Sequence, residues 1–161
     1  VKLNPTLPAG GNVYALAIAP NSERVVYLAD QIEFGDIEVF SVPLAGGTSS
    51  RVSDELVPGG GVQDFEIAPG SDFVFYRGDV WTNGVVELFR GRISGISGAD
   101  ERISGPMVAG GSVLSSWAIL PDGRQAIYSA DQEVDQEYEL YLGDLCLLCD
   151  GFEAGDLGRW D

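Results

Sequence analysis

Three segments of similar sequence follow one another along this 161-residue chain, and the repeat limits the folds open to it. They begin at Gly10, Gly59 and Gly110 and read GGNVYALAIAPNSERVVYLADQ, GGGVQDFEIAPGSDFVFYRGDV and GGSVLSSWAILPDGRQAIYSADQ. Measured at the shared proline, the units lie 49 and then 52 residues apart. A repeat of this length is typical of an array of small structural units that bury a core only when they stack.

Each unit has the pattern of short β-strands. ERVVYLAD, DFVFYRGD and RQAIYSAD are rich in β-branched and aromatic residues and follow turn-forming residues. A second matching piece follows in each unit (DIEVFSVPL, GVVELFRGRI and EYELYLGDL), and a short piece such as SSRVSDEL precedes the next Gly-Gly. No long stretch has helical spacing of apolar residues. We therefore predict an all-β fold of three propeller-like blades with about four antiparallel strands each.

The units resemble the TolB-like (PD40, WD40-like) β-propeller repeat. The first unit matches it through IAPNSERVVYLADQ and IEVFSVPLAGG, and the third carries the intact Pro121-Asp122-Gly123 turn. The resemblance covers residues 1–145, with units at about 8–56, 57–107 and 108–145. It implies a six-bladed propeller that makes protein contacts, whereas this sequence has three units. We expect half of a six-bladed propeller or an open repeat array.

The two ends of the repeat region suggest how copies could join. Residues 1–7 align with the segments that begin at Arg51 and Arg102, so we expect an orphan blade strand there, while the third unit lacks a matching fourth strand after Leu145. Another copy could supply that strand, giving a closed dimer or a filament. The expected assembly strand consists of Val1, Lys2, Leu3, Asn4, Pro5, Thr6 and Leu7. The alternatives are a fragment of a longer propeller and a compact three-blade monomer.

Composition excludes several classes of function. The chain has 25 acidic and 9 basic residues and a net charge of −16, which disfavours nucleic acid and anionic membrane surfaces as partners. It has no histidine, which excludes Ser-His-Asp and Cys-His catalysis and histidine-bound zinc. No apolar run is long enough to span a membrane. We predict no catalytic residues and a protein that is not an enzyme.

Acidic residues recur at two positions of the repeat. An aspartate ends one strand in every unit, and a glutamate begins the next. We expect these acids to make contacts between blades, with Arg51, Arg77 or Arg102 as donors to the glutamates; turn capping by the aspartates is the alternative. No calcium-binding motif is present, so Ca²⁺ is a minor alternative and no metal ligand or cofactor is predicted. The repeat acids are Asp30, Asp79, Asp131, Glu38, Glu87 and Glu139.

The tail, residues 146–161, has no partner in the repeat. We expect Cys146 and Cys149 to form a disulfide with each other or with a neighbouring chain; two free thiols are the alternative. CDGFEAGDLGRWD resembles the DGFESGDLSxW segment of secreted bacterial proteins, which implies export. Phe152 and Trp160 could anchor the tail on a neighbouring copy or on the chain's own third blade.

These patterns lead to one main hypothesis. The chain is a non-enzymatic structural protein, extracellular or periplasmic, that self-assembles by strand complementation between copies, into a filament or a closed particle. The alternative is a TolB-like propeller module, or a fragment of one, that binds a protein or glycan. Among the tryptophans, we expect Trp117 in the core, because Phe65 matches it in the second unit, and Trp81 at an exposed contact.

Overall fold

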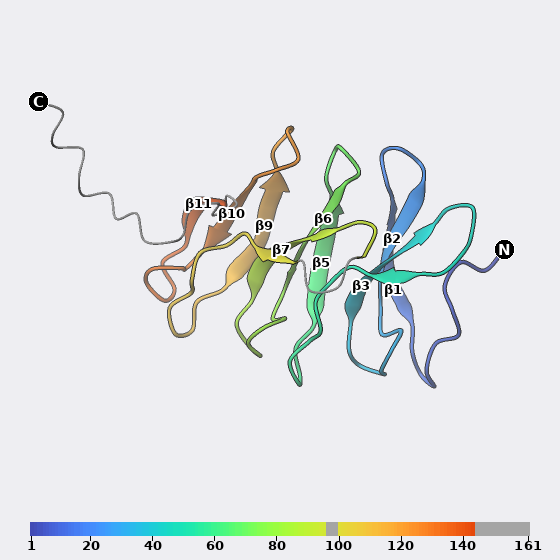
Figure 1. Ribbon diagram of the computed structural model, residues 1–161. Helices are drawn as coiled ribbons and strands as arrows, with labels where there is room; N and C mark the ends of the chain where they lie inside the picture. The colour runs from blue at the N-terminus through green and yellow to red at the C-terminus, as the bar shows by residue number, and fades with distance from the viewer. Residues whose placement is uncertain (96–99, 144–161) are drawn as a thin grey trace, which may run out of the picture.

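The computed structural model describes residues 1–95 and 100–143, which form three antiparallel β-sheets. Figure 1 shows the sheets side by side in chain order. Blade one contains β1 (Val13–Ile18), β2 (Arg24–Ala29), β3 (Glu38–Pro43) and β4 (Ser50–Arg51). Blade two contains β5 (Val62–Ile67), β6 (Phe73–Gly78), β7 (Glu87–Arg92) and β8 (Glu101–Arg102). Blade three contains β9 (Val113–Ile119), β10 (Ala126–Ala130) and β11 (Glu139–Gly143).

Within a blade, neighbouring strands are also neighbours in the sequence. The strand orders are β1-β2-β3-β4, β5-β6-β7-β8 and β9-β10-β11, so each sheet is a simple meander. Two blades have the predicted four strands, and blade three has three among the described residues. The all-β prediction of propeller-like blades is thus confirmed as three sheets of four, four and three strands.

The turn between the first two strands of each blade explains one sequence variation. Its third residue has a positive φ in every repeat: 60° at Ser22, 61° at Ser71 and 70° at Gly123. A left-handed backbone favours glycine, which is why the Pro-Asp-Gly form of the third unit suits this turn. The other two units place serine in the same strained conformation.

The core of each blade is built on the same pair of aromatic rings. A tyrosine of the second strand stacks on an aromatic residue of the third, with ring centroids 5.5–5.7 Å apart. Directly opposite positions on antiparallel strands place such rings on one face, where their contact stabilises the pair. The stacked pairs are Tyr27–Phe40, Tyr76–Phe89 and Tyr128–Tyr141.

The blades bury their remaining apolar residues against one another. Val26, Leu28 and Val39 of blade one pack with Tyr76 and Phe89 of blade two. The same arrangement recurs between blades two and three, where one apolar cluster contains Phe75, Leu88, Ala126, Tyr128 and Tyr141. Because side chains alternate along a strand, each blade has two faces. We call the face toward the preceding blade the rear face and the face toward the following blade the front face.

Candidate functional site

The repeated aspartates join two loops of their own blade. Asp79 Oδ1 accepts the backbone N–H of Gly61 at 2.9 Å, and Oδ2 accepts that of Gly84 at 2.9 Å. The other two repeats have the same arrangement. In each, one N–H donor is the residue just before the first strand, and the other lies in the loop before the third strand. Asp30 bonds Asn12 at 2.5 Å and Gly35 at 3.2 Å, and Asp131 bonds Ser112 at 2.7 Å and Gln136 at 3.0 Å.

These bonds lower the pKa of two of the three carboxylates. The N–H groups of Asn12 and Gly35, together with the Tyr14 hydroxyl, lower the pKa of Asp30. The N–H groups of Gln136 and Ser112 lower the pKa of Asp131 in the same way. The aspartates therefore act as turn caps inside each blade. Among the described residues, no group of three or more acidic, cysteine or histidine side chains is arranged to hold a metal ion.

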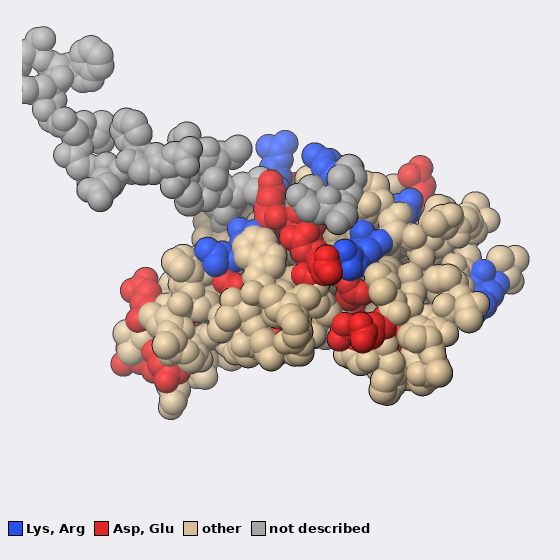
Figure 2. Space-filling view, turned by 60° about the horizontal axis from the view of Figure 1, so that its bottom comes forward, with Lys and Arg blue, Asp and Glu red and all other residues tan. Residues whose placement is uncertain are grey.

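The repeated glutamates pair with arginines of the fourth strand in the two four-stranded blades. Glu38 Oε1 lies 2.9 Å from Arg51 Nη1, and Glu87 Oε1 lies 2.8 Å from Arg102 Nη1. Both glutamates are buried, whereas the arginines are partly exposed. Burial raises the pKa of Glu38 more than Arg51 lowers it. The pairs lie within a blade, and Figure 2 shows acidic and basic side chains next to each other across this face of the array.

Glu139 is in a different situation from its two equivalents. It is exposed at the start of β11, where its carboxylate accepts the Tyr141 hydroxyl at 3.1 Å. The described part of blade three contains no fourth strand and therefore no arginine at the equivalent place. Among the described residues, the repeat thus leaves one acidic position without the basic partner that it has in the other two blades.

Contacts between blades involve residues that the repeat pattern did not identify. Arg77, expected as a donor to the repeat glutamates, instead bonds Asp64 Oδ2 and the carbonyl of Val113 in blade three. Trp117 Nε1 donates to Asp64 Oδ1 at 2.9 Å, across the same interface. Asp64 does not recur in the other units, which is why a search for repeated acids misses it.

A second unrepeated acid, Asp100, lies in blade two. The Tyr76 hydroxyl donates to Asp100 Oδ2 and accepts the backbone N–H of Asp54 at 3.4 Å. Burial raises the pKa of Asp100 to about 7. Its other oxygen, Oδ1, has no hydrogen-bond partner among the described residues.

Trp81, the expected exposed contact, is 41% exposed. Its ring packs edge-on against Phe89 with centroids 5.0 Å apart, and Nε1 donates to Asp54 Oδ2 at 3.3 Å. The side chain is thus held in place on the surface of blade two.

The front face of blade three carries apolar side chains that no described residue covers. Ile127, Leu140 and Leu142 are 39%, 75% and 58% exposed. Ile127 lies opposite Leu142, and both alternate with Tyr128 and Tyr141, which face blade two. In blade one the equivalent face is covered by blade two.

The rear face of blade one is the second open apolar surface. Leu16 and Ile18 are 67% and 55% exposed, and they lie opposite Tyr27 and Val25 on β2. Leu3 covers the outer part of the face, where it packs on a cluster that contains Tyr27 and Phe40. A small apolar hollow of about 100 Å³ lies between Leu3 and Leu16.

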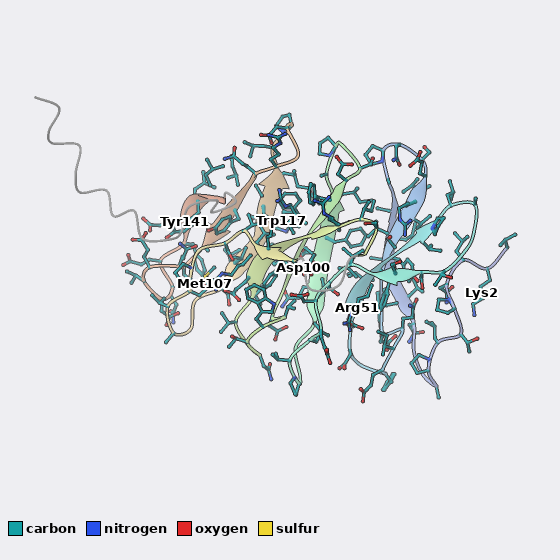
Figure 3. The ribbon with its side chains drawn as sticks, viewed as in Figure 1. Lys2, Arg51, Asp100, Met107, Trp117 and Tyr141 are labelled. Carbon is teal, nitrogen blue, oxygen red and sulfur yellow. The ribbon has the colours of Figure 1, made fainter. Side chains whose placement is uncertain are left out.

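Residues 1–7 form no strand in the single chain. Figure 3 shows Lys2 at one end of the array and Tyr141 at the other, so the two open faces are far apart within one molecule. The predicted disulfide residues Cys146 and Cys149 and the predicted tail anchors Phe152 and Trp160 lie outside the described residues. Within the described part of the chain, no helix is long and apolar enough to span a membrane.

Comparisons with known proteins identify the fold. No family model matches the chain, and no curated protein matches it by sequence. Among solved structures, it is similar to the crystal structure of an oligogalacturonate lyase from Vibrio parahaemolyticus, with a TM-score of 0.50 and 10% sequence identity. The match covers 85% of this chain and 36% of that protein, so this chain spans about a third of its length. The similarity shows an all-β array that resembles part of a β-propeller.

Proposed function

We propose that this chain is a non-enzymatic structural protein whose copies self-assemble end to end by strand complementation. The observation that carries the proposal is the pair of open apolar faces at opposite ends of the array, one on blade three and one on blade one. Inside the chain, the equivalent faces pack directly against each other. The front face of blade three in one copy therefore matches the rear face of blade one in another.

The magnitudes favour strand pairing in addition to apolar contact. Full burial of an aliphatic side chain contributes about 1.5–3 kcal/mol, so the largely exposed Leu16, Ile18, Leu140 and Leu142 together offer roughly 4–8 kcal/mol. Association costs about 4–15 kcal/mol in lost translational and rotational freedom. Apolar contact at one junction thus only offsets that cost, and further bonds are needed.

The edge of β11 can supply those bonds. In blades one and two the third strand pairs with a fourth, through β3–β4 and β7–β8. The outer edge of β11 has no such partner among the described residues. A strand from another copy would satisfy its backbone groups and cover Leu140, in the way that edge strands are completed in other assemblies. Because joining is head to tail, it gives a closed ring or an open filament.

Export from the cell belongs to the same proposal. The DGFESGDLSxW-like segment at residues 150–160 resembles secreted bacterial proteins, which supports an extracellular or periplasmic location. The TolB-like repeat supports a role in protein contacts rather than catalysis. Under the alternative, a TolB-like binding module or a fragment of a longer propeller, further blades would cover the open faces.

Sedimentation velocity over a range of concentrations tests self-assembly. We expect the chain to form species larger than a monomer as its concentration rises, more readily at higher salt because salt screens the repulsion between chains of net charge −16. Leu140→Asp should abolish these species, whereas Leu44→Asp, on a turn of blade one and 42% exposed, should not. A wild-type chain that stays monomeric at every concentration would refute the proposal.

A further inference from the structure

The last residue of the fourth strand and the two residues after it share a pattern in blades one and two: an arginine, an aliphatic residue and a serine. The arginine pairs with the glutamate that opens the third strand. The aliphatic residue is buried against the next blade, and its N–H bonds the third strand. The serine hydroxyl accepts an N–H from that same strand. The two sets are Arg51-Val52-Ser53 and Arg102-Ile103-Ser104.

The geometry of this pattern is nearly identical in the two blades. The N–H of Val52 donates to Val39 O at 2.7 Å, and that of Ile103 donates to Leu88 O at 2.8 Å. In return, the N–H of Val39 donates to Ser53 Oγ at 3.1 Å, and that of Leu88 donates to Ser104 Oγ at 3.1 Å. Together with the glutamate–arginine pair, these two hydrogen bonds fix the register between the third strand and the segment that follows it.

The start of this chain carries the same pattern. Arg51 and Arg102 each lie eight residues before the first glycine of the following Gly-Gly pair, and Lys2 lies eight residues before Gly10. Leu3 and Asn4 follow as an aliphatic residue and a hydrogen-bonding residue.

The structure places Leu3 as the repeat requires. Leu3 packs on the rear face of blade one, as Val52 packs on that of blade two and Ile103 on that of blade three. Lys2, next to it, is exposed. Leu3 is therefore already docked on blade one, but residues 2–4 have no third strand beside them among the described residues.

Charge supports a second copy as the missing partner. Lys2 is the only lysine in the chain and lies at the blade-one end. The exposed acids Glu133, Asp135, Glu137 and Glu139 lie at the blade-three end. A lysine that faces these acids favours head-to-tail joining, whereas contact between two blade-three ends would bring like charges together.

We propose that Lys2 of one copy pairs with Glu139 of the next, and that this contact sets the register of the junction; the inference rests on the self-assembly proposed above. Leu3 then donates its N–H to the carbonyl of Leu140, and the Asn4 side chain accepts the N–H of Leu140. Lys2 lies opposite Tyr141, as Arg51 lies opposite Phe40 in blade one.

A zero-length carbodiimide cross-linker tests this contact directly, because it joins a lysine amine only to a carboxylate that touches it. Lys2 carries the only side-chain amine in the chain, and fragmentation in the mass spectrometer distinguishes it from the α-amine of Val1. We expect mass spectrometry of the cross-linked dimer of the full chain to find Lys2 joined to Glu139. Cross-links that join Lys2 to other carboxylates and not to Glu139 would show that the proposed register is wrong.

Charge reversal provides a second test. Lys2→Glu and Glu139→Lys should each weaken self-association by at least about tenfold, because each places like charges at a covered contact. An equimolar mixture of the two variants should recover it, since every junction between unlike copies then pairs opposite charges. Control reversals on blade two, Asp72→Lys and Arg92→Glu, should change the association constant by less than about threefold.

The outcomes separate this inference from the proposed function. If the wild type does not associate, self-assembly itself fails, and the register fails with it. If the wild type associates and both end variants associate as strongly as the wild type, self-assembly stands but the Lys2–Glu139 register is wrong. Loss in each variant alone with recovery in the mixture supports both.

Discussion

The third repeat provides an internal control for the energetic role of the glutamate that opens the third strand of a blade. We predict that Glu38→Ala and Glu87→Ala lower the free energy of unfolding substantially, whereas Glu139→Ala has little effect on the monomer. The first two glutamates are buried and bonded to arginine, and the third is exposed.

The expected size follows from the exposure of the pair. Breaking a fully buried ion pair costs about 3–5 kcal/mol, and breaking an exposed one costs about 0–1 kcal/mol. The Glu38 side chain is 4% exposed, but that of Arg51 is 23% exposed, so water can solvate the arginine after the change. Burial also raises the pKa of Glu38, which shows that Arg51 only partly compensates for the lost hydration. We therefore expect a loss of about 2 kcal/mol.

Thermal unfolding at a concentration where the chain is monomeric measures this loss. In a chain of this size, about 2 kcal/mol corresponds to a fall in Tm of roughly 4–8 °C. Glu139→Ala should change Tm by less than about 2 °C. A double-mutant cycle of Glu38→Ala with Arg51→Ala should give a coupling energy of about 1–2 kcal/mol. Equal Tm values for the three glutamate variants would refute the argument.

Three further changes test the interior of the array. Asp79→Ala removes the acceptor of two backbone N–H groups and should cost about 1–2 kcal/mol in chemical denaturation, whereas Asp72→Ala should cost less than about 0.5 kcal/mol. Trp117→Phe keeps the apolar packing but removes the bond to Asp64, and urea unfolding should show a loss of about 1 kcal/mol. Because the folded pKa of Asp100 is raised to about 7, its contribution is present below the unfolded value of 3.8 and is lost as pH rises through about 7. Asp100→Asn should therefore match the wild type near pH 4 and exceed its unfolding free energy by about 1–2 kcal/mol near pH 8; equal values at both pH would contradict this.

The repeat and its strand patterns were sufficient to predict the blades. The spacing of the shared proline and tyrosine indicates a turn followed by a buried strand. The turn and the strand both depend on residues close in the sequence, and these recur in every unit. The sequence also identified the glutamates and named Arg51 and Arg102 among their donors. It could not place these pairs within a blade, because the distance between the third and fourth strands depends on the sheet register.

Contacts that occur in only one repeat could not be predicted from the sequence. Asp64 and Asp100 belong to no repeat, and their roles depend on side chains brought together by the stacking of blades and by strand pairing. The sequence aligned residues 1–7 with the segments at Arg51 and Arg102, but only the structure places Leu3 on the rear face of blade one, as Val52 lies on that of blade two.

Electron microscopy of the purified chain over a range of concentrations tests end-to-end assembly most directly. The account predicts closed rings or uniform fibres that are built from whole copies and disappear in Leu140→Asp. Three-blade particles of a single copy at every concentration, unchanged by that substitution, would contradict it.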